Sequence, residues 1–142
     1  MKTFFLALLV VLAFATKSYS QTITNVQVVF KTTDDDKDFD TKVEIVYKTG
    51  NEVLVAYRYN DLGGRFPDNS INNIPLDLRN SNIPESFIPG SKIIITIFPV
   101  GNDKWLFYFD LKITLSDGDV RLYTFNGVTL TEDDQTFTGT LR

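Results

Sequence analysis

Five aspartates stand within seven positions of the segment KTTDDDKDFDTKVEIVY, residues 31–47. Carboxylates held this close repel one another, and the repulsion either raises their pKa values or is neutralised by a cation. Ca²⁺ suits such a loop because it accepts about six to eight oxygen ligands in irregular geometry. The alternative interpretation is a solvated loop that protects neighbouring strand edges. The five residues are Asp34, Asp35, Asp36, Asp38 and Asp40.

The EF-hand is the first calcium motif to compare with this loop, and the comparison excludes it. Asp34, Asp36 and Asp38 match its D-x-D-x-D start, but Phe39 stands where the sharp turn needs glycine. Ile45 stands where the bidentate glutamate belongs. A calcium site would therefore need ligands from further loops at one end of a β-sandwich. The candidates in NDLGGRFPDN and VGNDKW are Asp61, Asp68, Asn69, Asn102 and Asp103.

The chain contains no histidine and no cysteine, which excludes several classes of site. Zinc, iron–sulfur and haem centres lose their usual ligands. Ser-His-Asp and Cys-His nucleophilic chemistry cannot be assembled either. Without disulfides, a small domain must be stabilised by apolar burial or by a metal.

The N-terminal segment MKTFFLALLVVLAFATKSYSQ has the features of a secretory signal peptide. Lys2 precedes an apolar run over residues 4–15, and Ser18 and Ser20 are small residues suited to cleavage after Ser20. The run is shorter than the ~20 apolar residues that cross a bilayer. We therefore expect a secreted protein, extracellular or periplasmic, whose single domain covers residues 21–142.

The acidic charge of that domain argues against some partners. Removal of residues 1–20 takes away Lys2 and Lys17, so the net charge changes from −4 to −6. Nucleic acid and bare anionic membranes are repelled by this field, although a bound divalent cation would reverse its sign locally.

Alternation with a period of two predicts an all-β fold. In KWLFYFDLKITL, residues 104–115, six alternate apolar side chains from Trp105 to Leu115 share one face, the other face is mixed, and we expect Trp105 in the core. Turn chemistry at residues 49–51 and 116–119 predicts two hairpins, and Asn126-Gly127 is a candidate third. About eight short strands without a helical period predict a β-sandwich or a small barrel, and we expect a single antiparallel β-sandwich. The other strand candidates are VQVVFK, TKVEIVYK, NEVLVAYRY, INNIPLDL, SKIIITIF, VRLYTF and TFTGTL.

Catalysis and surface binding leave weaker signals. Glu85, Asp103 or Asp110 could form the carboxylate pair of a glycosidase, but nothing in the sequence selects a pair. Aromatic residues on strands are usually core or cross-strand partners, although they also build binding platforms. Phe66 and Phe87 differ because they stand in loops, where each plugs the sandwich end or faces a ligand. The strand aromatics in question are Tyr57, Tyr59, Tyr108 and Tyr123.

The order of these features resembles PLAT-type and other C2-like β-sandwich domains. VQVVFKTTDDDKDFDTKVEIVY looks like their first strand, acidic loop and second strand, and residues 87–127 look like their back half. The resemblance implies loop acids at Asp34, Asp36, Asp38 and Asp103. Charged residues replace the glycine-rich stretch usual in the first loop, and the Trp105 strand is unusually aromatic. The expected ligand set, with weaker candidates added, is Asp34, Asp36, Asp38, Asp40, Asp68, Asn102 and Asp103.

Together, these features predict a secreted, non-catalytic binding module with a Ca²⁺ site at one loop end. Its ligand would be a protein, a carbohydrate or a lipid headgroup. C2-like and PLAT-type domains also insert apolar loop tips into membranes. The runner-up hypothesis is a metal-independent structural or cell-surface interaction protein, and a hydrolase comes third.

Overall fold

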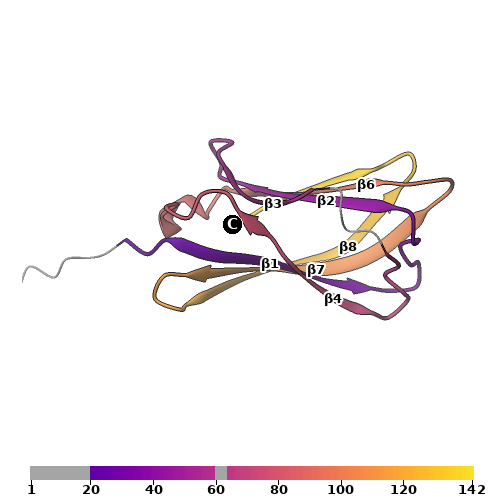
Figure 1. The fold of residues 1–142 in the computed structure, drawn as a ribbon, viewed down its shortest axis with the longest axis horizontal. Helices are drawn as coiled ribbons and strands as arrows, with labels where there is room; N and C mark the ends of the chain where they lie inside the picture. The colour runs from indigo at the N-terminus through magenta and orange to yellow at the C-terminus, as the bar shows by residue number, and fades with distance from the viewer. Residues whose placement is uncertain (1–19, 60–63) are drawn as a thin grey trace, which may run out of the picture.

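The computed structural model describes residues 20–59 and 64–142 and shows two antiparallel sheets packed face to face (Figure 1). The predicted signal peptide falls, apart from Ser20, outside the described residues. Within the described part, no helix is long and apolar enough to cross a membrane. The strands are β1 (Ile23–Thr32), β2 (Lys42–Lys48), β3 (Leu54–Arg58), β4 (Ile71–Pro75), β5 (Asp77–Leu78), β6 (Lys92–Phe98), β7 (Lys104–Leu115), β8 (Val120–Thr131) and β9 (Thr136–Thr140).

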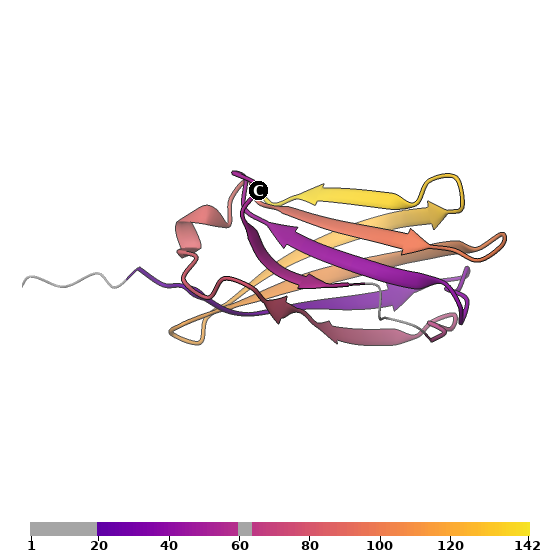
Figure 2. The same ribbon diagram turned by 45° about the horizontal axis from the view of Figure 1, so that its top comes forward.

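The β-sandwich predicted from the sequence is confirmed. One sheet has the order β4-β1-β7-β8 and the other the order β5-β3-β2-β6-β9, and all pairs are antiparallel. The two layers are seen one above the other in Figure 1, and Figure 2 shows one sheet partly in front of the other, with strands along the long axis. Among the described residues, the single helical element is the short 3-10 turn η1 (Glu85–Phe87).

Alternating side chains of the central strands form the core between the sheets. The six apolar residues that the sequence placed on one face of β7 are all buried, and Trp105 is fully buried. Facing them from the other sheet, Val43, Ile45 and Tyr47 of β2 are buried as well. The burial of apolar surface, which contributes about 25 cal/mol of stabilising free energy per Å², is the main stabilising term.

Three details differ from the sequence-based expectation. Asn126-Gly127 forms no hairpin, because it lies within β8, where the β7–β8 register shifts and Gly127 has a positive φ of 65°. This is the geometry of a β-bulge. The segment INNIPLDL is also two strands, because the chain passes from one sheet (β4) to the other (β5) at Leu76. The described residues accordingly form nine strands, where the sequence predicted about eight.

The two ends of the sandwich are built differently. The β7–β8 turn and η1 lie at the end where the chain enters β1 (Figures 1 and 2). The β1–β2, β6–β7 and β8–β9 connections lie at the opposite end, together with the described residues between β3 and β4. Every loop that the sequence proposed for calcium therefore reaches one end, which we call the loop end.

Gly139 of β9 gives a direct test of the packing between β8 and β9. A Cβ atom at this position would overlap the ring of Phe125, which stacks on Phe109 at 4.7 Å. We predict that Gly139→Ala lowers the free energy of unfolding by about 1–3 kcal/mol, because the aromatic ring must move. Urea unfolding measures the effect, with Thr138→Ala on the exposed face as the control. Equal midpoints for the two variants would contradict this packing.

Candidate functional site

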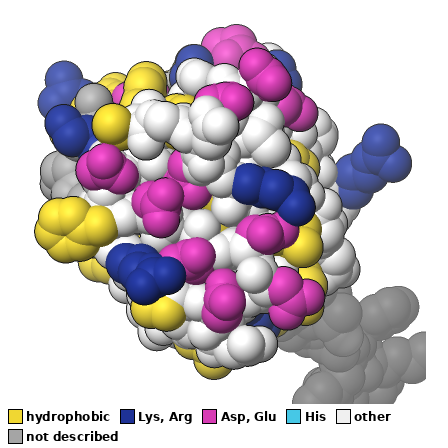
Figure 3. All heavy atoms as spheres, turned by 90° about the vertical axis from the view of Figure 1, so that its right-hand side faces the viewer, with side chains coloured by type: hydrophobic (Ala, Val, Ile, Leu, Met, Phe, Trp, Pro, Cys, Tyr) yellow, Lys and Arg dark blue, Asp and Glu magenta, His cyan; other side chains and the backbone are white. Residues whose placement is uncertain are grey.

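A polar depression lies at the loop end, where the β1–β2 and β6–β7 connections meet. It has a volume of about 230 Å³ and is surrounded mainly by acidic side chains. Figure 3 views this end of the molecule and shows acidic and basic side chains interspersed over it. We call this feature the acidic depression; its lining residues are Asp34, Asp35, Asp36, Asp38, Asn102, Asp103 and Lys104.

The structure brings together most of the predicted ligands, but not all of them. Asp34, Asp36, Asp38, Asn102 and Asp103 line the acidic depression.

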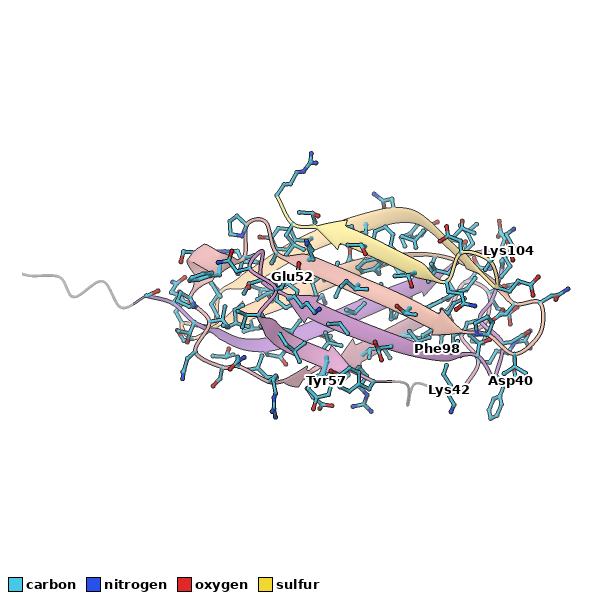
Figure 4. All side chains as sticks on the ribbon, turned by 90° about the horizontal axis from the view of Figure 1, so that it is seen from above. Asp40, Lys42, Glu52, Tyr57, Phe98 and Lys104 are labelled. Atoms are coloured by element: carbon cyan, nitrogen blue, oxygen red, sulfur yellow. The ribbon has the colours of Figure 1, made fainter. Side chains whose placement is uncertain are left out.

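Asp40 and Asp68 belong to the same end but are not among its lining residues. Figure 4 shows Asp40 at this end together with Lys104. Asp61 lies outside the described residues. Asn69 has a positive φ of 57°, and its backbone N–H donates to the carbonyl of Thr33, so it serves the loop conformation.

Two surface cations already compensate part of the negative charge. The Arg65 guanidinium donates to the Asp36 carboxylate, and this hydrogen bond lowers the pKa of the Asp36 carboxyl below its usual range. Lys104 pairs with Asp35 at 2.6 Å. Because the Arg65 and Lys104 side chains are more than half exposed, both are surface ion pairs that contribute little to the free energy of folding.

A third cation, Lys37, is buried beneath the loop. Its side chain is fully enclosed, and its ammonium donates to the backbone carbonyls of Asp38 at 2.9 Å and Thr41 at 2.6 Å. Burial lowers the pKa of Lys37, whereas the negative charges of Asp103, Asp38 and Asp40 act in the opposite direction. The ammonium therefore holds the loop backbone and offsets part of the aspartate charge.

Lys37 also connects the acidic loop to the aromatic core. Its ammonium lies 5.1 Å from the ring centroid of Phe66, an arrangement that favours a cation. The backbones of Lys37 and Phe66 exchange two hydrogen bonds, of 3.3 and 3.1 Å. The Phe66 ring in turn packs edge-on against Trp105 at 5.4 Å and is almost completely buried. Phe66 thus plugs the sandwich end, which was one of its two predicted roles.

Sequence reasoning missed Lys37, Arg65 and Lys104 as members of the site. The signal for Lys37 was present, because it is the single cation within the run DDDKDFD. Its burial depends on Phe66, which stands far along the chain, so the local pattern does not reveal it. Arg65 immediately precedes Phe66, and its pairing with Asp36 follows from the same loop contact.

The side chains of the acidic depression have the oxygen chemistry of a calcium site, but their present positions do not have the geometry of one. Carboxylate and amide oxygens are the ligands that Ca²⁺ prefers. Within residues 20–59 and 64–142, however, no group of three or more acidic side chains is close enough together to hold a metal ion. A bound ion would therefore require the side chains of the acidic depression to turn inward and the surface cations to move away.

The carboxylates considered for hydrolysis lie apart. Glu85 belongs to η1, at the end of the sandwich opposite the loop end, and pairs with Arg121 at 2.6 Å. Asp110 lies on β7 and pairs with Lys31 of β1 at 2.7 Å. Asp103 lines the acidic depression. These three residues therefore form no common site.

The remaining aromatic candidates are dispersed over the surface. Tyr57 of β3 and Tyr59, just beyond the end of β3, have ring centroids 4.3 Å apart, so each covers part of the other. Tyr108 is exposed on the opposite sheet, and Tyr123 is half-buried at the inner side of β8. Phe87 of η1 is partly exposed at the end opposite the acidic depression. The described residues hold no continuous aromatic platform made from this set.

No protein-family model matches the sequence, and no curated protein matches it significantly.

Replacement of Lys37 tests whether its ammonium supports the loop. We predict that Lys37→Met lowers the free energy of unfolding by about 2–4 kcal/mol, because two loop carbonyls and several carboxylates lose their cation. Urea unfolding at neutral pH measures the effect. Lys42→Met, at an exposed lysine of β2, is the matched control and should stay within about 0.5 kcal/mol of the original chain. A Lys37→Met variant as stable as the control would contradict the role.

Proposed function

We propose that this chain is a secreted, non-catalytic binding module of the C2-like or PLAT-like type. In this proposal the acidic depression takes up Ca²⁺, and the loop end then recognises a protein, a carbohydrate or a lipid headgroup. The observation that carries the proposal is the meeting of oxygen-bearing side chains from two loops that are far apart in sequence. Loops on a rigid β-scaffold are common places for binding.

Calcium uptake is physically reasonable because the opposing interactions are weak. Carboxylates outnumber cations around the acidic depression, and the pairs Arg65–Asp36 and Lys104–Asp35 are solvent-exposed. An incoming divalent ion would therefore replace these cations at little cost. Asp34, Asp38 and Asn102 also line the depression, and their side chains form no ion pair within the described residues.

Secretion and the absence of catalysis belong to the same proposal. The chain enters β1 at the end opposite the acidic depression, so cleavage after Ser20 would leave the binding end untouched. The hydrolase alternative loses support because Glu85, Asp103 and Asp110 are dispersed. A chain without histidine or cysteine also lacks the commonest catalytic bases and nucleophiles.

A second candidate function is a metal-independent interaction protein, and Lys37 is the observation that favours it. The buried ammonium already provides a positive charge beneath the acidic loop, bound by carbonyls as a metal would be. In this case the loop keeps its shape without Ca²⁺, and the acidic surface itself contacts a basic partner.

The two candidates separate in a thermal melt of the Gln21–Arg142 chain, stripped with EDTA and then titrated with Ca²⁺, with Mg²⁺ as the ion control. An ion that binds only the folded state at about one hundred times its Kd adds roughly 2.7 kcal/mol. For a domain of this size, the midpoint should rise by roughly 10 °C with Ca²⁺. An unchanged midpoint at millimolar Ca²⁺ would exclude the calcium site and leave the metal-independent candidate.

Substitutions locate the ion. Asp36→Asn and Asp103→Asn should each reduce the Ca²⁺-dependent rise, because both residues line the acidic depression. Asp133→Asn is the control at the same end, since the β8–β9 turn reaches the loop end but does not line the depression. Asp119→Asn is the control at the opposite end. Equal effects from all four variants would show that Ca²⁺ is attracted only by the overall negative charge of the domain and is not bound at the acidic depression.

A further inference from the structure

The outer edge of β8 is the longest unpaired strand edge of the sandwich. The two sheets end in four edge strands, and among these β4 and β9 have five residues and β5 has two, whereas β8 has twelve. Proteins protect sheet edges with short strands, prolines, charges and bulges. β4 ends in Pro75, and the second half of β8 has the bulge at Gly127. The first half, VRLYTF, has none of these devices except Arg121.

In this half of β8, alternate residues direct their backbone N–H and C=O groups toward solvent at the outer edge. The N–H of Leu115 donates to the carbonyl of Asp119 at 2.8 Å, which fixes the alternation of hydrogen-bonded pairs between β7 and β8. Arg121 and Tyr123 therefore direct their backbone groups toward β7. Val120, Leu122 and Thr124 direct theirs to the outer edge, where no described backbone group bonds to them.

Side chains on both faces of the edge add apolar surface. Val120 and Leu122 lie on the outer face and are 53% and 57% exposed. On the inner face, Arg121 and Tyr123 border a second depression of about 340 Å³. Its other walls are Ile88 and Pro89 together with Glu85 and Ser86. A free strand edge and a neighbouring depression are the two features of recognition by β-strand addition.

We propose that the occupant of this edge is a second copy of the chain, whose β8 pairs antiparallel with the first about a two-fold axis at Leu122. In this register Leu122 lies opposite Leu122 of the second copy, and Val120 lies opposite Thr124 of the second copy. All three edge residues then form hydrogen-bonded pairs, each exchanging two backbone bonds. The two four-stranded sheets become one continuous sheet.

The sequence of the edge is complementary to itself in this register, which favours a second copy over a foreign peptide. On the inner face Arg121 lies opposite Tyr123 of the second copy, and a guanidinium beside an aromatic ring is attractive. The Tyr123 ring of the second copy enters the depression beside Ile88 and Pro89. On the outer face the exposed Val120 and Leu122 become covered. An isologous contact needs this self-complementarity.

Charge distribution is compatible with the pairing. Antiparallel β8 strands place the loop ends of the two copies at opposite ends of the dimer, because the pairing half of β8 begins at the β7–β8 turn. The two acidic depressions are thereby kept apart, and salt screens their repulsion beyond about 10 Å. A contact of one strand and one side-chain depression is small, so we expect Kd in the range of roughly 10 μM to 1 mM.

Sedimentation velocity of the Gln21–Arg142 chain over a wide concentration range tests the proposal. This chain contains every strand and the whole buried core of the described residues. The expected result is a monomer–dimer equilibrium, and a monomer alone up to about 1 mM would overturn the proposal.

Variants at the edge identify the contact. Leu122→Pro removes an outward N–H without removing a bond to β7, and Leu122→Lys places like charges opposite each other. Each should weaken the dimer at least about tenfold. Thr138→Lys, at an exposed position of the β9 edge, is the matched control and should leave the equilibrium unchanged. Circular dichroism checks that each variant folds. If Leu122→Pro does not fold, the Leu122→Lys variant is the one that tests the edge. A dimer that survives both Leu122 changes would overturn the proposed edge.

The absence of cysteine from the chain allows a direct readout of the register. Leu122→Cys places two thiols opposite each other across the two-fold axis, within about 6 Å between Cα atoms. A short bis-maleimide linker should join them rapidly, whereas Thr138→Cys should react only at the rate of random collisions. Equal cross-linking of the two variants would contradict the register.

Discussion

The buried ammonium of Lys37 is the interaction on which the loop end depends. It binds two loop carbonyls, faces the Phe66 ring and lies beneath several aspartates. Desolvation of a cation is costly, so the site is stable only because carbonyls, ring and carboxylates act on the same atom. The Phe66 ring packs against Trp105 and so connects Lys37 to the core. The acidic loop is therefore attached to the hydrophobic interior through this cation as well as through backbone hydrogen bonds, such as that from the Leu106 N–H to the Asp35 carbonyl.

The two ends of the sandwich present different surfaces. At the loop end, the core is closed by Phe66 and Lys37, and the charged side chains above them remain available to an ion or partner. At the other end, η1 and the first half of β8 leave a depression and an open strand edge. A dimer through that edge would present two loop ends facing away from each other. Weak binding by one loop end would then gain from bivalency on a surface with repeated ligands.

Sequence reasoning predicted the features that depend on neighbouring residues. The β7 core face and the hairpins at residues 49–51 and 116–119 follow from period-two alternation and turn chemistry, which are local signals. The candidate hairpin at Asn126-Gly127 was wrong, because the same dipeptide also fits a bulge within a long strand. The burial of Lys37 and the ion pair of Arg65 were not predicted because both depend on the contact between two distant loops. The same contact decides which aspartates line the acidic depression.

A double-mutant cycle with Lys37→Met and Asp103→Asn tests the central role of the buried cation most directly. Asp103 is the carboxylate with the largest stabilising effect on the charged form of Lys37. The free energies of unfolding of the original chain, both single variants and the double variant give the coupling between them. If Lys37 neutralises the acidic loop, the coupling should be about 1 kcal/mol or more, with the double variant more stable than the sum of the single effects predicts. Additivity within about 0.3 kcal/mol would contradict the account.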